Sequence, residues 1–182
     1  MSRLSMVTLA ELPGLACPYC GRVVGADTSW AVSAATLWGW CGWKLANGDG
    51  RVDGVLLLGP NEEPGHALVN ALWVRPGLTG SGYGRQLVQA AAAGLVQQKE
   101  REIVAVGSRQ HLRCEAPPSG FLRAVGFARS LDDRLWHLDL DRAVLGERSG
   151  VRSAFERLMQ SLRPVTPPNP AGGAISGRAN RG

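Results

Sequence analysis

The stretch that most constrains the fold is residues 72–88, LWVRPGLTGSGYGRQLV, where an apolar segment passes through a glycine cluster into a helix-like segment. Gly80, Gly82 and Gly84 alternate in this cluster. Unpaired backbone N–H groups and the helix dipole meet at a helix N-terminus and favour an anion there. One or two glycines are enough for a tight turn, so three indicate that a ligand approaches the backbone. A tight turn without a ligand is the alternative.

Two nucleotide-binding patterns do not fit this turn. The P-loop pattern G-x-x-x-x-G-K-[ST] requires a lysine where Tyr83 stands. The dinucleotide pattern G-x-G-x-x-G has two starting points here, and its third glycine then falls on Arg85 or on Leu87. The anion is therefore not expected to be a nucleotide bound in either of these ways.

The segments around the turn predict an α+β fold. Residues 42–60 read as two antiparallel strands, because the sequence NGDG at 47–50 is a strong hairpin signal. Residues 66–74, HALVNALWV, are too uniformly apolar to have a solvent-facing side, which is typical of a central strand. A strand that follows a crossover helix lies parallel to the strand before it. The remaining expected elements are helices at 27–38, 83–100 and 119–125, a strand at 101–108 and a hairpin at 127–140 that turns at Asp132-Asp133.

Composition divides the chain into four parts. Residues 1–26 contain several proline and glycine breakers and are expected to be irregular. Residues 27–149 form the expected folded domain. Residues 150–163 are expected to form a last amphipathic helix. Residues 164–182 are rich in proline and glycine with little to bury, so we expect disorder there.

A third pattern, [Q/R]-x-x-G-x-[G/A] after a strand ending L-x-V-x-P, fits the turn at all but one position. Residues 72–76 supply the strand end and residues 79–84 the loop. Residues 119–127, SGFLRAVGF, are similar to a short helix of the form F-Y-x-x-x-G-F. In this order and spacing the segments resemble the GNAT superfamily of N-acetyltransferases, over about residues 28–141. The resemblance implies an α+β fold with a mixed, mostly antiparallel central sheet, a splayed parallel strand pair and flanking helices.

The resemblance also implies the acyl donor, acetyl-CoA, and direct transfer of its acetyl group from the thioester to a primary amine. The pantetheine arm would lie between the splayed strands, where N–H groups near Leu72 and Val74 would polarise the thioester carbonyl. The turn would hold the pyrophosphate. Arg85 would add a charge-assisted bond or be a solvated helix residue. The implied cofactor-binding residues are Leu72, Trp73, Val74, Gly80, Ser81, Gly82, Tyr83, Gly84 and Arg85.

Two positions depart from the family's pattern. Leu122 stands where a tyrosine often serves as the acid, and Thr79 stands where an arginine or glutamine opens the loop. His66 is the candidate base, because histidine titrates near neutral pH. Cys114 is the candidate replacement for the missing acid. A structural histidine and a buried, inert cysteine are the alternatives.

Two pairs of possible metal ligands share one internal spacing. Cys17 and Cys20 form a C-x-x-C motif, and His111 and Cys114 lie equally far apart in HLRC. Together they would make a Cys3His set of the kind that binds structural zinc. Two half-sites so far apart in the sequence are weak support for one site. Free thiols or a redox-active pair are therefore preferred, no metal is expected, and structural zinc stays the alternative.

The net charge of +5 does not indicate nucleic-acid binding, because it is concentrated in residues 150–182, which hold five arginines against one glutamate. Residues 1–149 carry 15 basic and 14 acidic side chains, without the basic stripe that phosphate contacts require. No run approaches the roughly 20 apolar residues of a membrane span. Glu11 interrupts the most apolar N-terminal stretch, unlike in a signal peptide. We expect a cytoplasmic monomer or homodimer that binds neither nucleic acid nor membrane.

The sequence favours an acetyl-CoA-dependent N-acetyltransferase whose amine acceptor it does not identify. The alternative is a non-catalytic acyl-CoA-binding or regulatory module, which Leu122 and the absence of a clear base favour. Direct-transfer enzymes can nevertheless work largely by positioning their substrates. A zinc-stabilised interaction domain of the same fold is a third hypothesis.

Overall fold

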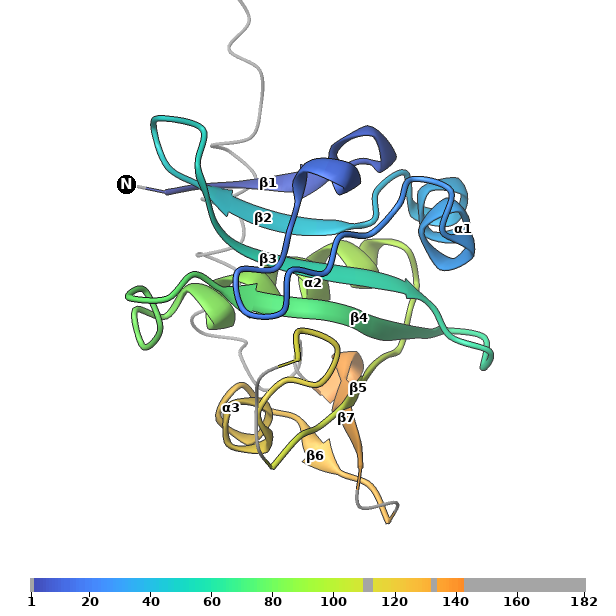
Figure 1. Ribbon diagram of the computed structural model, residues 1–182. Helices are drawn as coiled ribbons and strands as arrows, with labels where there is room; N and C mark the ends of the chain where they lie inside the picture. Colours follow the sequence, from blue (N-terminus) through green and yellow to red (C-terminus); the bar gives the residue numbers. More distant parts are fainter. Residues whose placement is uncertain (1, 110–112, 132–133, 143–182) are drawn as a thin grey trace, which may run out of the picture. The chain divides into compact units, whose positions relative to one another are not determined.

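Seven strands form one mixed sheet in the residues that the computed structural model describes, which are 2–109, 113–131 and 134–142 (Figure 1). The spatial order of the strands is β1-β2-β3-β4-β5-β7-β6. Neighbouring strands are antiparallel except for β4 and β5, so the predicted α+β fold with a mostly antiparallel sheet is confirmed. The strands are β1 (Arg3–Val7), β2 (Gly42–Ala46), β3 (Val52–Pro60), β4 (His66–Val74), β5 (Glu102–Val106), β6 (Ala128–Arg129) and β7 (Leu135–Asp139).

The parallel pair is splayed. Pairing of β4 with β5 extends only from His66 opposite Glu102 to Leu68 opposite Val104. Beyond these residues β4 continues beside β3, and β5 continues beside β7. The two central strands therefore diverge toward their C-terminal ends, as the family resemblance implies.

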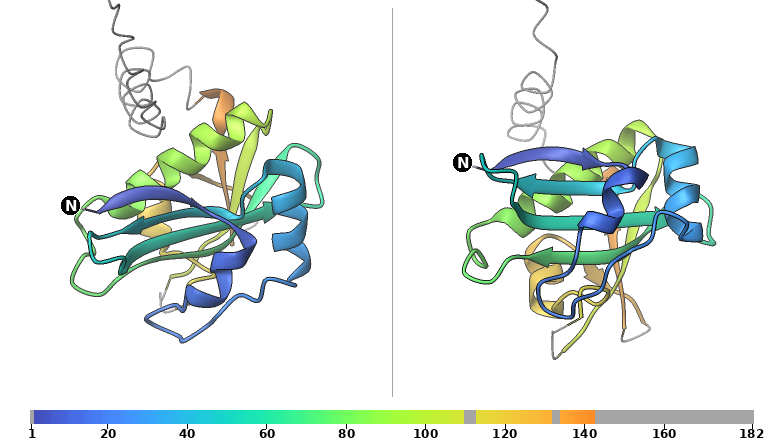
Figure 2. Two further views of the ribbon diagram at one scale, coloured as in Figure 1. Left: turned by 90° about the horizontal axis from the view of Figure 1, so that it is seen from above. Right: turned by 45° about the horizontal axis from the view of Figure 1, so that its top comes forward.

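Two hydrophobic clusters cover the two faces of the sheet. On one face α2 (Tyr83–Gln97) packs Leu87 and Leu95 against strand residues that include Leu56. On the other face the segment from the 3-10 helix η1 (Leu9–Gly14) toward α1 (Ser29–Trp38) packs against β3 and β4 (Figure 2). The helix α1 contributes side chains to both clusters.

The N-terminal segment corrects the expectation that residues 1–26 are irregular. Its first strand, β1, pairs antiparallel with the otherwise open edge of β2, and Val7 is completely buried. The helix η1 begins with a capping box between Thr8 and Glu11, and its Leu12 lies in the core. Pairing to a distant strand edge is a tertiary effect that the sequence of the segment does not show. Its proline and glycine residues therefore predicted irregular structure for a segment that contains a strand.

The other predicted elements are present in the described residues. Gly39 ends α1 in the left-handed conformation that favours glycine (φ 81°). The short helix α3 (Ser119–Ala124) and the β6–β7 hairpin follow β5. The hairpin turn at Asp132-Asp133, the expected helix at 150–163 and the expected tail at 164–182 lie outside the described residues. No helix in the described part of the chain has the length and apolar character needed to cross a membrane.

Candidate active site

A β-bulge lies in β4 where it leaves β5. Leu57 pairs with Ala71 and Leu58 with Val69, so Asn70 is the extra residue on β4. The bulge exchanges the two faces of the strand: Val69 packs into the cluster under α2, whereas Ala71 packs into the cluster on the opposite face. The bulge thus changes the direction of the backbone N–H and C=O groups of Leu72 to Val74 relative to those of the residues before it.

The glycine turn connects β4 to α2 and is exposed. Gly77, Gly80 and Gly82 have φ values of 84°, 84° and 82°, which other residues rarely adopt. Gly82 is the N-cap of α2, and the first helical bond runs from the N–H of Gln86 to the carbonyl of Gly82 (3.0 Å). The three N–H groups before Gln86 therefore have no acceptor within the helix, and no side chain caps it. This end of α2 suits an anion.

The packing of two helices requires a glycine at position 84, whether or not a ligand binds. A Cβ atom at this position would lie 2.7 Å from Cε2 of Phe121 in α3. Gly84 thus allows the first turn of α2 to pack closely on α3. The alternation of three glycines combines two requirements, left-handed backbone at Gly80 and Gly82 and close helix packing at Gly84.

A double-mutant cycle tests this packing. Gly84→Ala and Phe121→Leu are expected to couple by about 1 kcal/mol, because the smaller Leu side chain makes room for the added methyl group. Urea unfolding of the wild type, both single variants and the double variant measures the coupling. Additive effects of the two substitutions would contradict the contact.

The loop after β5 bridges the diverging strands. On one side the N–H of Leu72 in β4 donates to the carbonyl of Cys114 (2.7 Å). On the other side Ser108, just after β5, donates its N–H to the carbonyl of Pro117 (2.9 Å) and accepts from the N–H of Ser119 (2.9 Å). The loop thus hydrogen bonds to both strands where they separate. The amide of Leu72, which the resemblance assigns to the thioester carbonyl, has a carbonyl partner from the chain itself.

The N-terminal segment contacts the same edge of β4. The hydroxyl of Tyr19 donates to the carbonyl of Val74 (2.7 Å), and the guanidinium of Arg22 lies 3.4 Å from the carbonyl of Asn70. Arg22 also forms an ion pair with Glu115 in the loop after β5. Sequence reasoning missed these contacts, because nothing in the sequence relates residues 15–25 to the edge of β4.

His66 lies at the other end of β4 from the glycine turn. Its Nδ1 is 3.3 Å from a carboxylate oxygen of Glu102 and 3.5 Å from one of Glu63. Glu102 also bonds His137 (2.8 Å to Nδ1). A pocket of about 270 Å³ opens beside His66, and its lining residues are Glu63, Pro64, His66, Arg101, Glu102, Asp139 and Asp141. Carboxylates outnumber cationic groups in this pocket, so it favours a cation.

A second pocket, of about 530 Å³, has the opposite character. Four arginines line it together with Trp136, near the C-terminal end of β5. Arg123 of α3 lies over the ring of Trp136, 6.0 Å from its centroid. Of these two pockets, the one beside His66 therefore suits a cationic amine.

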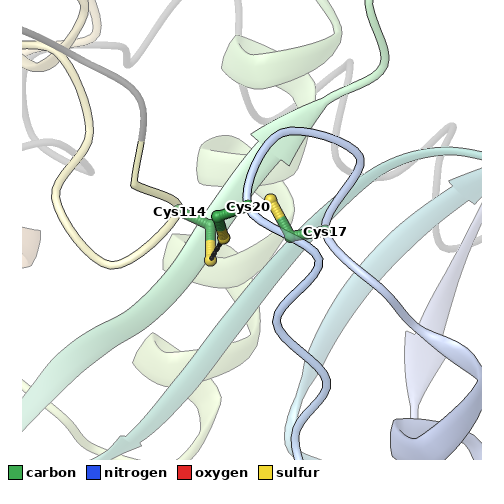
Figure 3. Close-up of side chains that lie close together, drawn as sticks. All are labelled: Cys17, Cys20 and Cys114. Atoms are coloured by element: carbon green, nitrogen blue, oxygen red, sulfur yellow. Dashed lines mark hydrogen bonds between the residues drawn. The ribbon is translucent and has the colours of Figure 1, made fainter.

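Three cysteine sulfurs meet beside the edge of β4 (Figure 3). Cys17 and Cys20 come from the N-terminal segment and Cys114 from the loop after β5, and the Sγ atoms of Cys20 and Cys114 are 3.6 Å apart. Burial raises the pKa of the Cys114 thiol. Backbone amides, that of Arg22 first, lower the pKa of Cys20. The fourth residue of the expected Cys3His set, His111, lies outside the described residues.

Four other residues that the sequence singled out lie in different parts of the fold. Trp73 is buried on the face opposite α2. Arg85 donates to the carbonyl of Ala124 at the end of α3 (2.7 Å), so its guanidinium is anchored to the protein. Leu122 is buried in the core under α2, and the hydroxyl of Tyr83 lies 3.1 Å from Oγ of Ser2.

This architecture, a mixed sheet with one diverging parallel pair and a glycine turn leading into a helix, defines a fold of the acetyltransferase class. The family model of the acetyltransferase (GNAT) family matches residues 18–113. The chain therefore belongs to the acetyltransferase (GNAT) family. No curated protein matches it closely enough to count as a relative.

Solved structures share the fold at low sequence identity. A GNAT family N-acetyltransferase (YhbS) from Escherichia coli in complex with CoA is 17% identical, with a TM-score of 0.55 over 80% of this chain and 85% of that one. A GNAT family acetyltransferase from Staphylococcus aureus is 13% identical, with a TM-score of 0.55 over 77% and 99%. The structure of yncA from Salmonella typhimurium with its cofactor acetyl-CoA is 18% identical, with a TM-score of 0.53 over 77% and 94%. At these identities the likeness shows the fold.

Proposed function

We propose that the protein is an acetyl-CoA-dependent N-acetyltransferase that transfers the acetyl group directly to a primary amine. The observation that carries the proposal is the divergence of β4 and β5 after the bulge at Asn70, next to the uncapped N-terminus of α2. Family membership agrees, and two proteins of similar fold hold CoA or acetyl-CoA. One end of the coenzyme would bind the glycine turn and its thioester would reach the diverging strands.

The pyrophosphate would bind at the N-terminus of α2. The N–H groups of Tyr83, Gly84 and Arg85 lack acceptors within the helix, whereas the N–H of Ser81 in the turn before them donates to the carbonyl of Leu78 (3.3 Å). Ser81 and Gly82 bring the backbone close without a bulky side chain. Arg85 would contribute positive charge from its anchored position beside α3 rather than reach freely for a phosphate.

The pantetheine arm would pair with β4 between Leu72 and Val74. For the thioester oxygen to accept from the N–H of Leu72, the carbonyl of Cys114 must first give up this bond. The amide would then stabilise the negative charge that develops on this oxygen. The amide thus exchanges one acceptor for another, and the carbonyl of Cys114 must then accept from a water molecule.

Transfer would begin with the neutral amine attacking the thioester carbon. The carbon–sulfur bond breaks, the coenzyme leaves as a thiolate, and the nitrogen loses a proton to a base. Because the thiol of Cys114 faces Cys20 and Cys17, the proposal leaves protonation of the thiolate to solvent.

His66 would accept the proton of the amine. Glu102 next to Nδ1 can hold the ring so that Nε2 is free to act as the base. His66 lies six residues before Leu72, or about 20 Å along an extended strand, so the proton would pass along a chain of several water molecules. The acidic pocket beside His66 would attract the acceptor as an ammonium ion, which would lose one proton to solvent before it attacks as the neutral amine.

His66→Ala is expected to lower kcat by about 100-fold while KM for acetyl-CoA changes little, because general base catalysis contributes 10²–10⁴-fold and the coenzyme binds elsewhere. His137→Ala is the matched control, since His137 contacts the same carboxylate of Glu102. Steady-state kinetics with an accepted amine measure both variants. Equal kcat values in the two variants would remove His66 from the mechanism.

A second candidate function is binding of acyl-CoA without catalysis. Two observations favour it. The N–H of Leu72, which would stabilise the thioester oxygen, already donates to the carbonyl of Cys114. Leu122 is buried and cannot donate a proton to the leaving thiolate. Release of free CoA from acetyl-CoA, followed with a thiol reagent across a panel of polyamines, amino acids, aminoglycosides and peptides, separates the two. Amine-dependent release supports the enzyme. Saturable binding of acetyl-CoA without release with any amine supports the binding module.

A further inference from the structure

The three cysteines beside β4 have no role in the proposed chemistry. Cys17 and Cys20 lie in the segment that crosses the sheet face, and Cys114 follows them by more than ninety residues. Their Sγ atoms nevertheless all lie within 4.8 Å of one another. Cys17 and Cys114 are buried, at 3% and 5% exposure, whereas Cys20 is exposed. Three thiols that converge from two separate segments form a set of soft ligands.

The backbone around Cys17 and Cys20 forms a tight turn that presents both sulfurs to one side. The N–H of Gly21 donates to the carbonyl of Cys17 (2.9 Å), and the N–H of Cys17 donates to the carbonyl of Arg22 (2.9 Å). Gly21 closes the turn with φ 70°, where a side chain would be strained. These bonds hold the backbone of Cys17 and Cys20 in one compact turn.

The separation of the Cys20 and Cys114 sulfurs matches a tetrahedral thiolate site. A Zn–S bond of about 2.3 Å places two sulfurs of a tetrahedron about 3.8 Å apart. The Sγ atoms of Cys20 and Cys114 are 3.6 Å apart, and the 4.8 Å limit for all three is within reach of small side-chain rotations. A disulfide between Cys20 and Cys114 would use only two of the three sulfurs and leave Cys17 beside it without a purpose.

We propose that Cys17, Cys20 and Cys114 bind one Zn²⁺ ion and supply three of its four ligands. The fourth position is open to a solvent molecule. Three thiolates and the ion carry a net charge of −1, and the guanidinium of Arg22, two residues after Cys20, lies between the same two segments. Binding releases the thiol protons and involves no oxidation.

The ion would fix the N-terminal segment to the loop after β5. Cys114 also provides the carbonyl that accepts from Leu72, and Tyr19, inside the C-x-x-C turn, donates to Val74. One metal ion would therefore hold two segments against the edge of β4 that has diverged from β5. Its role is structural.

The test is the metal content of the full-length protein, purified under reducing conditions and reconstituted with excess zinc, then freed of unbound metal. Elemental analysis is expected to find one zinc per chain, and replacement by Co²⁺ is expected to give the thiolate-to-cobalt charge-transfer absorption. Cys17→Ser, Cys20→Ser and Cys114→Ser are each expected to lose stoichiometric zinc. Cys41→Ala is the matched control and is expected to keep one ion, because the Cys41 thiol is buried elsewhere and donates to the carbonyl of Ala31 (3.4 Å).

The wild-type measurements do not depend on how well a variant folds. Absence of stoichiometric zinc and of the cobalt absorption from the wild type would overturn the site. Full retention of zinc by Cys20→Ser would overturn it too. A Cys20–Cys114 disulfide that forms in place of metal binding under the same conditions, detected by intact mass and thiol counting, would do the same. Chelation of the bound ion is expected to lower the Tm of the wild type by several degrees and to leave that of Cys20→Ser unchanged.

Discussion

Replacing Ser81 by glutamate is expected to weaken binding of acetyl-CoA at least tenfold. Ser81 is exposed and directly precedes Gly82, the N-cap of α2, where the pyrophosphate would bind. A carboxylate about 4 Å from a phosphate charge costs about 1–4 kcal/mol, depending on how well water screens the pair, and 1.4 kcal/mol corresponds to a factor of ten in affinity. Calorimetric titration with acetyl-CoA measures the change.

Ser81→Gln is the matched control, because it adds the same volume without the charge. It is expected to change the affinity less than threefold. The carboxylate of Ser81→Glu should also raise the free energy of unfolding slightly, since a negative charge near a helix N-terminus is favourable. Weaker binding in a protein of equal or greater stability would therefore identify an anion site. Equal affinities of the two variants would contradict binding of the pyrophosphate at this turn.

Gly42→Ala is expected to destabilise the fold by about 3 kcal/mol or more. Gly42 lies at the start of β2, between Val7 of β1 and Leu57 of β3. A Cβ atom at this position would lie 2.1 Å from the carbonyl oxygen of Leu56 and 2.9 Å from the Cα of Leu57. Both are backbone atoms of a central strand, so the sheet itself would have to shift. Urea unfolding measures the loss.

The control for this substitution is Gly48→Ala. Gly48 lies in the turn between β2 and β3, and an added Cβ atom would meet no atom within 4 Å. Its free energy of unfolding is expected to stay within about 0.5 kcal/mol of the wild type or to rise slightly, because alanine reduces the freedom of the unfolded chain. A loss for Gly42→Ala no larger than that for Gly48→Ala would show that β2 and β3 pack less closely than the structure indicates.

The fold was largely predictable because its strongest signals are local. Three elements can each be recognised from a short stretch of sequence: the largely apolar β4, the Asn-Gly turn before β3 and the alanine-rich α2. The strand β1 was not predictable, because its stability comes from pairing with β2. The same holds for the bulge at Asn70, which depends on how β4 aligns with β3.

The site was predictable only where backbone conformation determines it. The glycine turn follows from sequence, since Gly80 and Gly82 adopt a left-handed conformation that other residues disfavour. The bond from Leu72 to Cys114 and the anchoring of Arg85 on Ala124 join residues about forty positions apart, and no local pattern encodes them. The roles of His66 and of the cofactor-binding residues in catalysis stay predictions.

The diverging strands and the glycine turn are expected to bind acetyl-CoA, which calorimetric titration of the wild-type protein tests. We expect saturable binding of one molecule per chain, with a Kd between about 1 µM and 1 mM, an affinity that falls as salt is added, and a rise in Tm. No binding heat and no rise in Tm at millimolar acetyl-CoA would contradict it.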